Sequence, residues 1–80
     1  MKTRIASRAL NTQIGYRIKL ARKRAGRDQS ELARAIGHAS PTSVHMMEAG
    51  AKMIRASDLA LIAEFLKCTI RSLFPKGSVR

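Results

Sequence analysis

Acidic residues are scarce in this sequence, where five Asp and Glu stand against sixteen Lys and Arg and leave a formal net charge of +11. An excess of this size favours a polyanionic partner. A hydrophobic content of 45% is too high for a basic disordered tail, so a folded domain is expected. The length of 80 residues allows one domain with a small core, which a partner subunit would help to stabilise.

Cysteine is nearly absent as well, and so are long hydrophobic runs. The single cysteine, Cys68, cannot form an internal disulfide bond, and nothing in the sequence points to an oxidising compartment. Residues 1–27 hold nine basic residues and no acidic one, but no unbroken apolar run that could serve as a signal peptide or a membrane span. We therefore expect a cytoplasmic protein without a membrane partner.

Residues that could carry catalysis are also few. His38, His45 and Cys68 lack the spacing of metal ligands, and no nucleophile, base and orienting group form a recognisable set. No glycine-rich phosphate loop occurs, and the few carboxylates are explained as helix caps or an ion pair. Cys68 is expected to act as a small buried hydrophobe. We predict a protein that is not an enzyme and that holds no cofactor and no metal.

The stretch from Asp28 to Gly50 organises the sequence and predicts two short helices joined by a tight turn. Asp28 followed three residues later by Glu31 is a capping-box pattern, which starts a helix at Gln29 by satisfying its free N–H groups. Gly37 is the expected end of this helix, because glycine enters a left-handed cap without steric cost.

The second of these helices has its own start signal. Ser40 offers a capping hydroxyl, and Pro41 stands at the first helical position, where no backbone N–H is needed. Val44 and Met47 are expected to face inward, and Gly50 closes the helix.

Three further helices are predicted around this stretch. The first runs from Thr12, as its cap, to about Ala25; the second starts at Ser57; a short last helix follows Thr69 and stops at Pro75. Apolar residues at helical spacing support the first two, namely Ile14, Ile18, Ala21 and Ala25, and then Leu59, Ile62, Ala63 and Leu66. No segment alternates like a strand, so an all-α fold with five helices is expected.

An ordered set of residues resembles the helix-turn-helix domain of the phage Cro and repressor family (XRE-like). The matching positions are Gln29 at the helix start, Ala33 at the helix crossing, Gly37 in the turn, Val44, and Glu48-Ala49-Gly50 in place of the family's Glu-x-Gly. The resemblance extends from about Gln13 to Phe74. It implies a five-helix DNA-binding domain over residues 12–75, a basic N-terminal arm over residues 1–11 and a C-terminal tail over residues 76–80.

The sequence departs from the family at two places, and the arm has two readings. The segment from Gly37 to Glu48 is one residue longer than usual, and the extra residue fits best in the turn around His38 and Ala39. Lys67 stands where relatives often have glycine. The arm, with Lys2, Arg4 and Arg8, is either a frayed terminus or a segment that follows DNA.

The resemblance implies that the helix over residues 41–48 enters the major groove of double-stranded DNA. Its outward residues are the candidate base contacts: Pro41, Thr42, Ser43, His45 and Met46. None of them is the arginine, glutamine or asparagine that makes bidentate contacts to a base. We therefore expect affinity to come mainly from phosphate contacts, with specificity from apolar contacts, DNA shape and dimer spacing.

Other residues have expected supporting roles. The candidate phosphate contacts are Arg27, Gln29, Ser40, Lys52 and Arg55. By resemblance, Arg22 pairs with Glu48 in a bidentate ion pair that joins the first helix to the end of the third. A homodimer interface is expected at the C-terminal end, through Ile70, Leu73, Phe74 and Val79.

These observations favour a sequence-specific, repressor-like regulator of transcription that acts as a homodimer in a bacterial or phage context. Phage or plasmid repressor, restriction-modification controller and antitoxin all remain open. An alternative is an antitoxin or other interaction module whose helix-turn-helix binds a partner protein, such as a toxin or another regulator, as well as its own promoter. A third reading is nonspecific binding of RNA or an anionic membrane through residues 1–27.

Overall fold

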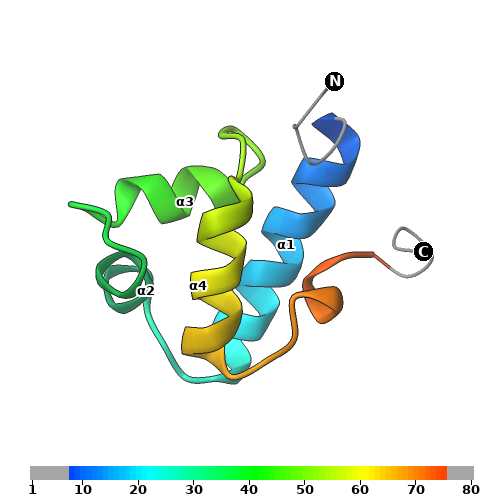
Figure 1. Cartoon of the computed structure of the whole chain (residues 1–80). Coiled ribbons are helices and arrows are strands. Elements are labelled where there is room, and N and C mark those ends of the chain that lie inside the picture. The colour runs from blue at the N-terminus through cyan, green and yellow to red at the C-terminus, as the bar shows by residue number, and fades with distance from the viewer. Residues whose placement is uncertain (1–7, 76–80) are drawn as a thin grey trace.

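The computed structural model describes residues 8–75, which form four α-helices followed by one 3₁₀ turn (Figure 1). The helices are α1 (Arg8–Arg24), α2 (Gln29–Ala35), α3 (Thr42–Glu48) and α4 (Ala56–Leu66), and the turn is η1 (Arg71–Leu73). The described residues contain no strand, as the all-α expectation requires. None of their helices is both long enough and apolar enough to cross a membrane.

The prediction of a fifth α-helix is wrong. Residues after Thr69 form only the 3₁₀ turn, in which Thr69 Oγ1 accepts a hydrogen bond from the Ser72 N–H at 3.1 Å. Phe74 is already extended, with φ −97° and ψ 148°. It precedes Pro75, and a residue before proline is sterically disfavoured in the α region. The helical segment therefore ends at Leu73 and remains a single 3₁₀ turn.

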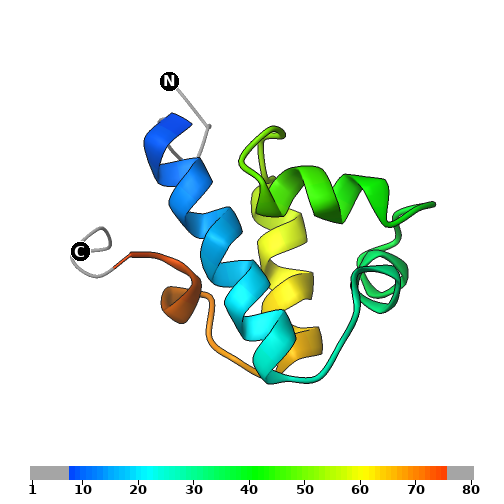
Figure 2. The same cartoon turned by 180° about the vertical axis from the view of Figure 1, so that it is seen from behind.

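The core lies where α1 packs against α3 and α4, with α2 against α3 and α4, and η1 against α1 (Figures 1 and 2). Each element contributes at least one side chain that is almost fully buried: Ile14 and Ile18 from α1, Leu32 from α2, Val44 and Met47 from α3, Leu59 and Ile62 from α4, and Leu73 from η1. The helical spacing of these residues predicted most of this core.

Three predicted helix starts differ from the observed ones. Thr12 lies inside α1, where its hydroxyl donates to the Arg8 carbonyl at 3.0 Å instead of capping the helix. Residues 8–11 of the predicted arm are therefore the start of α1, while residues 1–7 and the tail 76–80 lie outside the described residues. Ser57 lies inside α4, whose N-cap is Arg55. Pro41 is the N-cap of α3, and the Ser40 hydroxyl accepts the Thr42 N–H at 3.3 Å.

Two glycines explain how the helices approach and turn. Gly15 lies on the buried side of α1, where a Cβ atom would overlap the carbonyl oxygen of Met47. The backbones of α1 and α3 can therefore meet only if this residue has no side chain. Gly37 has φ 78°, which is the left-handed conformation predicted for the end of α2.

Candidate nucleic-acid interface

The start of α2 is fixed by the predicted capping box. The Asp28 carboxylate accepts the Glu31 N–H at 2.8 Å, and the Glu31 carboxylate accepts the Asp28 N–H at 2.9 Å. This reciprocal pair satisfies two of the free N–H groups at the helix end. Gln29, the first residue of α2, is thereby held next to the outer side of α3.

The exposed side of α3 carries four of the five predicted base contacts. Val44 and Met47 are fully buried, as predicted, and they fix which side of the short helix faces outward. Exposed side chains follow at the remaining positions, namely Pro41, Thr42, His45 and Met46. Gln29, Pro41, Thr42 and His45 line one open hollow between α2 and α3. A candidate phosphate contact and three candidate base contacts therefore share one surface.

Ser43 differs from the other predicted base contacts. It is half-buried, its Oγ lies 2.7 Å from Nδ1 of His38, and its hydroxyl can donate to the Ser40 carbonyl at 3.3 Å. Its polar atom is therefore engaged within the protein rather than presented outward.

The ion pair expected from the resemblance is present and buried. Nε and Nη2 of Arg22 donate to the two carboxylate oxygens of Glu48, at 2.7 and 3.1 Å. These hydrogen bonds raise the pKa of Arg22 above its ordinary value, although burial acts in the opposite direction. Arg22 also donates to the Arg27 carbonyl at 2.9 Å, and the Gln29 amide donates to Glu48 at 3.0 Å. The pair thus joins α1, the start of α2 and the end of α3.

The loop between α3 and α4 is held by a residue that sequence reasoning missed. The Asn11 side chain donates to the Lys52 carbonyl at 2.9 Å and accepts the Ile54 N–H at 3.1 Å. This loop, with the exposed residues Lys52 and Arg55, lies at the same end of the molecule as the start of α1 (Figures 1 and 2). The available signal was that Asn11 stands three residues before Ile14, on the apolar stripe of α1.

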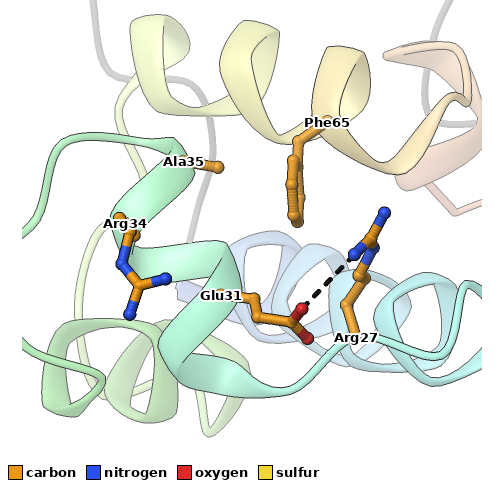
Figure 3. Close-up of a pocket in the computed structure, with 5 residues that line it drawn as sticks. All are labelled: Arg27, Glu31, Arg34, Ala35 and Phe65. Carbon is orange, nitrogen blue, oxygen red and sulfur yellow. Dashed lines mark hydrogen bonds and ion pairs between the residues drawn. The ribbon is translucent and has the colours of Figure 1, made fainter.

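The side chain of Arg27, another predicted phosphate contact, lies against residues of α2 and α4. Its Nη1 is 3.3 Å from the Glu31 carboxylate, and its guanidinium lies 5.2 Å from the centre of the Phe65 ring. Figure 3 shows these groups with Arg34 and Ala35 around a hollow between α2 and α4. Arg27 does not line the hollow between α2 and α3.

The predicted dimer residues do not form one exposed group. Leu73 is only 1% exposed and belongs to the core of its own chain, because η1 packs its side chain against α1. It cannot contact a second subunit without unfolding, and that assignment is corrected. Ile70 is 44% exposed, and Phe74 is partly buried against the core. Val79 lies outside the described residues.

The described arrangement matches a known family. A helix-turn-helix family model matches residues 18–73, which include all four helices at least in part. The chain belongs to the helix-turn-helix family, in its Cro/XRE-type branch. The sequence resemblance to phage Cro and repressor proteins is thereby confirmed.

Two solved structures that share a quarter of their residues with the chain are similar to it over most of its length. The restriction-modification controller protein C.AhdI from Aeromonas hydrophila has 25% identity and a TM-score of 0.73, covering 79% of this chain and 94% of its own. The hypothetical transcription factor NHTF from Neisseria has 25% identity and a TM-score of 0.74, covering 94% and 86%.

A third structure supports the fold alone. The DNA-binding domain of BldD has 21% identity and a TM-score of 0.76, covering 88% of this chain and all of its own. No curated protein matches the chain.

Proposed function

We propose that this protein is a sequence-specific regulator of transcription that binds double-stranded DNA with α3 in the major groove and acts in a repressor-like manner. The observation that carries the proposal is the open hollow that Gln29 of α2 shares with Pro41, Thr42 and His45, which lie at the start and on the exposed side of α3. The opposite side of α3 is anchored in the core by Val44 and Met47. The major groove admits an α-helix, and residues near the start of that helix reach the base edges. The family, the similarity to the restriction-modification controller protein C.AhdI and the similarity to the hypothetical transcription factor NHTF support the same function.

Phosphate contacts are proposed at both edges of this surface. Gln29 is the first residue of α2 and Ser40 lies two residues before α3, and the side chain of each has an N–H or O–H group that can donate to a phosphate oxygen. Lys52 and Arg55 are exposed on the loop after α3. The side chain of Arg55 is 73% exposed, so its pairing with Asp58 at 3.5 Å leaves it accessible to DNA. Met46, which is 39% exposed, offers an apolar contact to a thymine methyl group.

The proposed active form is a homodimer that reads two half-sites about 34 to 36 Å apart on one face of the duplex. The exposed side chain of Ile70, together with Phe74, supports an interface near η1. A small single core also gains stability from association. Sedimentation of the protein over a range of concentrations tests this assembly.

A gel-shift with the DNA upstream of the protein's own gene tests the function. We expect Thr42→Ala and His45→Ala to weaken specific binding, since each removes a side-chain hydrogen-bonding group from the exposed side of α3. Ala60→Ser, at an exposed position of α4, serves as the control and is expected to bind like the unchanged protein. Equal binding by all three variants, or no preference over unrelated duplex, would contradict the proposal.

A second candidate function is that of an antitoxin or similar module that also binds a partner protein. The hollow between α2 and α4 supports it, because it combines two arginines with an aromatic ring and lies apart from the α2–α3 hollow (Figure 3). Arginine and aromatic residues are enriched in protein interfaces. Under this candidate function, Arg34→Glu abolishes capture of the partner protein, while the variant still shifts promoter DNA in a gel. A variant that keeps both activities would contradict this candidate function.

A further inference from the structure

His38 joins three segments of the helix-turn-helix through the two nitrogens of its ring. Nδ1 lies 2.7 Å from Ser43 Oγ on α3, and Nε2 lies 3.4 Å from Asp58 Oδ1 in the first turn of α4. The His38 and Asp58 side chains are only 12% and 5% exposed. The ring is therefore enclosed between two helices while its own backbone belongs to the turn before α3.

The contacts of His38 with Ser43 and Asp58, here called the His38 bridge, join α3 to α4. These two helices have few other contacts with each other. The helix α3 packs chiefly on α1 and α2, and its seven residues have little direct contact with α4. No side-chain hydrogen bond is made by its N-cap, Pro41.

The backbone of His38 is itself fixed by a hydrogen bond to the end of α2. Its N–H donates to the Ala33 carbonyl at 2.8 Å, one residue after Gly37 in its left-handed conformation. This bond fixes the start of the turn on the end of α2. The imidazole nitrogens point to opposite sides of one rigid ring, so a single side chain reaches both neighbours. Asparagine and glutamine do not combine these two directions.

We propose that His38 is a positioning residue that holds α3 against α4 and thereby sets the angle at which Thr42 and His45 meet DNA. This inference rests on the proposed DNA-binding function. The Ser43 hydroxyl then serves the orientation of the helix, and the base contacts of α3 come from its other exposed residues. Asp58 anchors the ring on α4 and also faces Arg55 at 3.5 Å.

A double-mutant cycle on DNA affinity tests the bridge. His38→Ala and Ser43→Ala are each expected to weaken binding about tenfold, as the loss of one hydrogen bond of about 1.4 kcal/mol would. The double variant is expected to bind no more weakly than His38→Ala, because both changes break the same connection. Ala39→Ser, an exposed neighbour in the turn, is the control and should bind as the unchanged protein does. Full additivity of the two losses would overturn the proposal.

A matched pair of variants at Asp58 provides the rescue test. Asp58→Ala and Asp58→Asn both remove the charge that faces Arg55, but only asparagine keeps an oxygen that can accept from His38. We expect Asp58→Asn to bind DNA several-fold more tightly than Asp58→Ala. Equal binding by the two variants would overturn the role assigned to the His38–Asp58 contact.

Amide hydrogen exchange without DNA separates this inference from the proposed function. In both His38→Ala and Ser43→Ala, the amides of Val44–Met47 are expected to exchange about tenfold faster, while those in the centres of α1 and α4 keep their rates. Unchanged α3 exchange in both variants would overturn the inference even if the protein binds DNA. Faster α3 exchange in a protein that binds no duplex would support the bridge and refute the DNA-binding function instead.

Discussion

At the scale of single residues, the Arg22–Glu48 pair is a buried bidentate ion pair that joins α1 to the end of α3. Both side chains are less than a tenth exposed, and their two hydrogen bonds are supplemented by the Arg27 carbonyl and the Gln29 amide. The planar fork of arginine matches both carboxylate oxygens, which the single ammonium group of lysine cannot do. Removing one partner leaves the other charged and poorly solvated.

We therefore expect Glu48→Ala to lower the free energy of unfolding by about 3 kcal/mol and Arg22→Lys by a smaller amount. Urea unfolding followed by circular dichroism measures both. The exposed Glu64→Gln is the control, with an expected change of about 0.5 kcal/mol or less. Because the pKa of Arg22 is raised, loss of its charge does not weaken the pair between neutral pH and the ordinary pKa of arginine, and the stabilisation is lost only as the pH rises above the raised value. A Glu48→Ala loss that vanished between neutral and mildly alkaline pH would contradict this account.

Gly15 provides a second residue-scale prediction. Alanine in a helix is ordinarily about 1 kcal/mol more favourable than glycine. At this position its Cβ would overlap the Met47 carbonyl, so Gly15→Ala is expected to destabilise the protein by about 2 kcal/mol or more. Gly26→Ala is the comparison, because a Cβ there meets no atom within 4 Å and only the backbone conformation, at φ 73°, opposes it. Thermal unfolding of the two variants should rank Gly15→Ala as the less stable.

At the scale of secondary-structure elements, some features that depend on near neighbours in sequence were predicted correctly, whereas contacts between distant residues were not predicted. The capping box of Asp28 and Glu31 and the left-handed Gly37 depend on neighbours in sequence, and both were predicted correctly. Asn11 contacts residues 41 and 43 positions away, and His38 contacts Asp58 20 positions away. No periodic pattern encodes such pairs. Leu73 was assigned to a surface because its helix was predicted from sequence, whereas packing of η1 on α1 buries it.

At the end of α4, the C-cap residue Lys67 adopts a backbone conformation that suits glycine better than lysine. Lys67 has φ 56° and ψ 46°, and it is the non-glycine residue with positive φ among residues 8–75. Left-handed geometry costs an L-residue roughly 1 to 2 kcal/mol. We expect Lys67→Gly to raise the free energy of unfolding by about 0.5 to 1 kcal/mol. Lys67→Ala removes the same charge without relieving the backbone, and a gain of equal size in that variant would attribute the effect to charge instead.

At the scale of the whole molecule, the five carboxylates are largely engaged within the fold. Asp28 and Glu31 cap α2, Glu48 pairs with Arg22, and Asp58 faces His38 and Arg55. Only Glu64 among the five is exposed without such a structural role in the contacts described for residues 8–75. Acidic side chains therefore serve the folding of the domain, while most of its lysines and arginines are directed to solvent. The net charge of +11 is therefore available on the surface to attract an anionic partner.

This distribution leads to a prediction about salt. If about six phosphates are neutralised in the complex, raising salt from roughly 50 to 200 mM should weaken DNA binding about a thousandfold, because bound counterions are released on association. Replacing both Lys52 and Arg55 by alanine should reduce the slope of log affinity against log salt by about two, since each removes one phosphate contact. Thr42→Ala, which leaves the charge unchanged, should weaken binding at every salt concentration with the same slope. Fluorescence anisotropy titrations with a labelled duplex measure all three proteins, and an unchanged slope in the double variant would mean that the loop between α3 and α4 does not contact the DNA backbone.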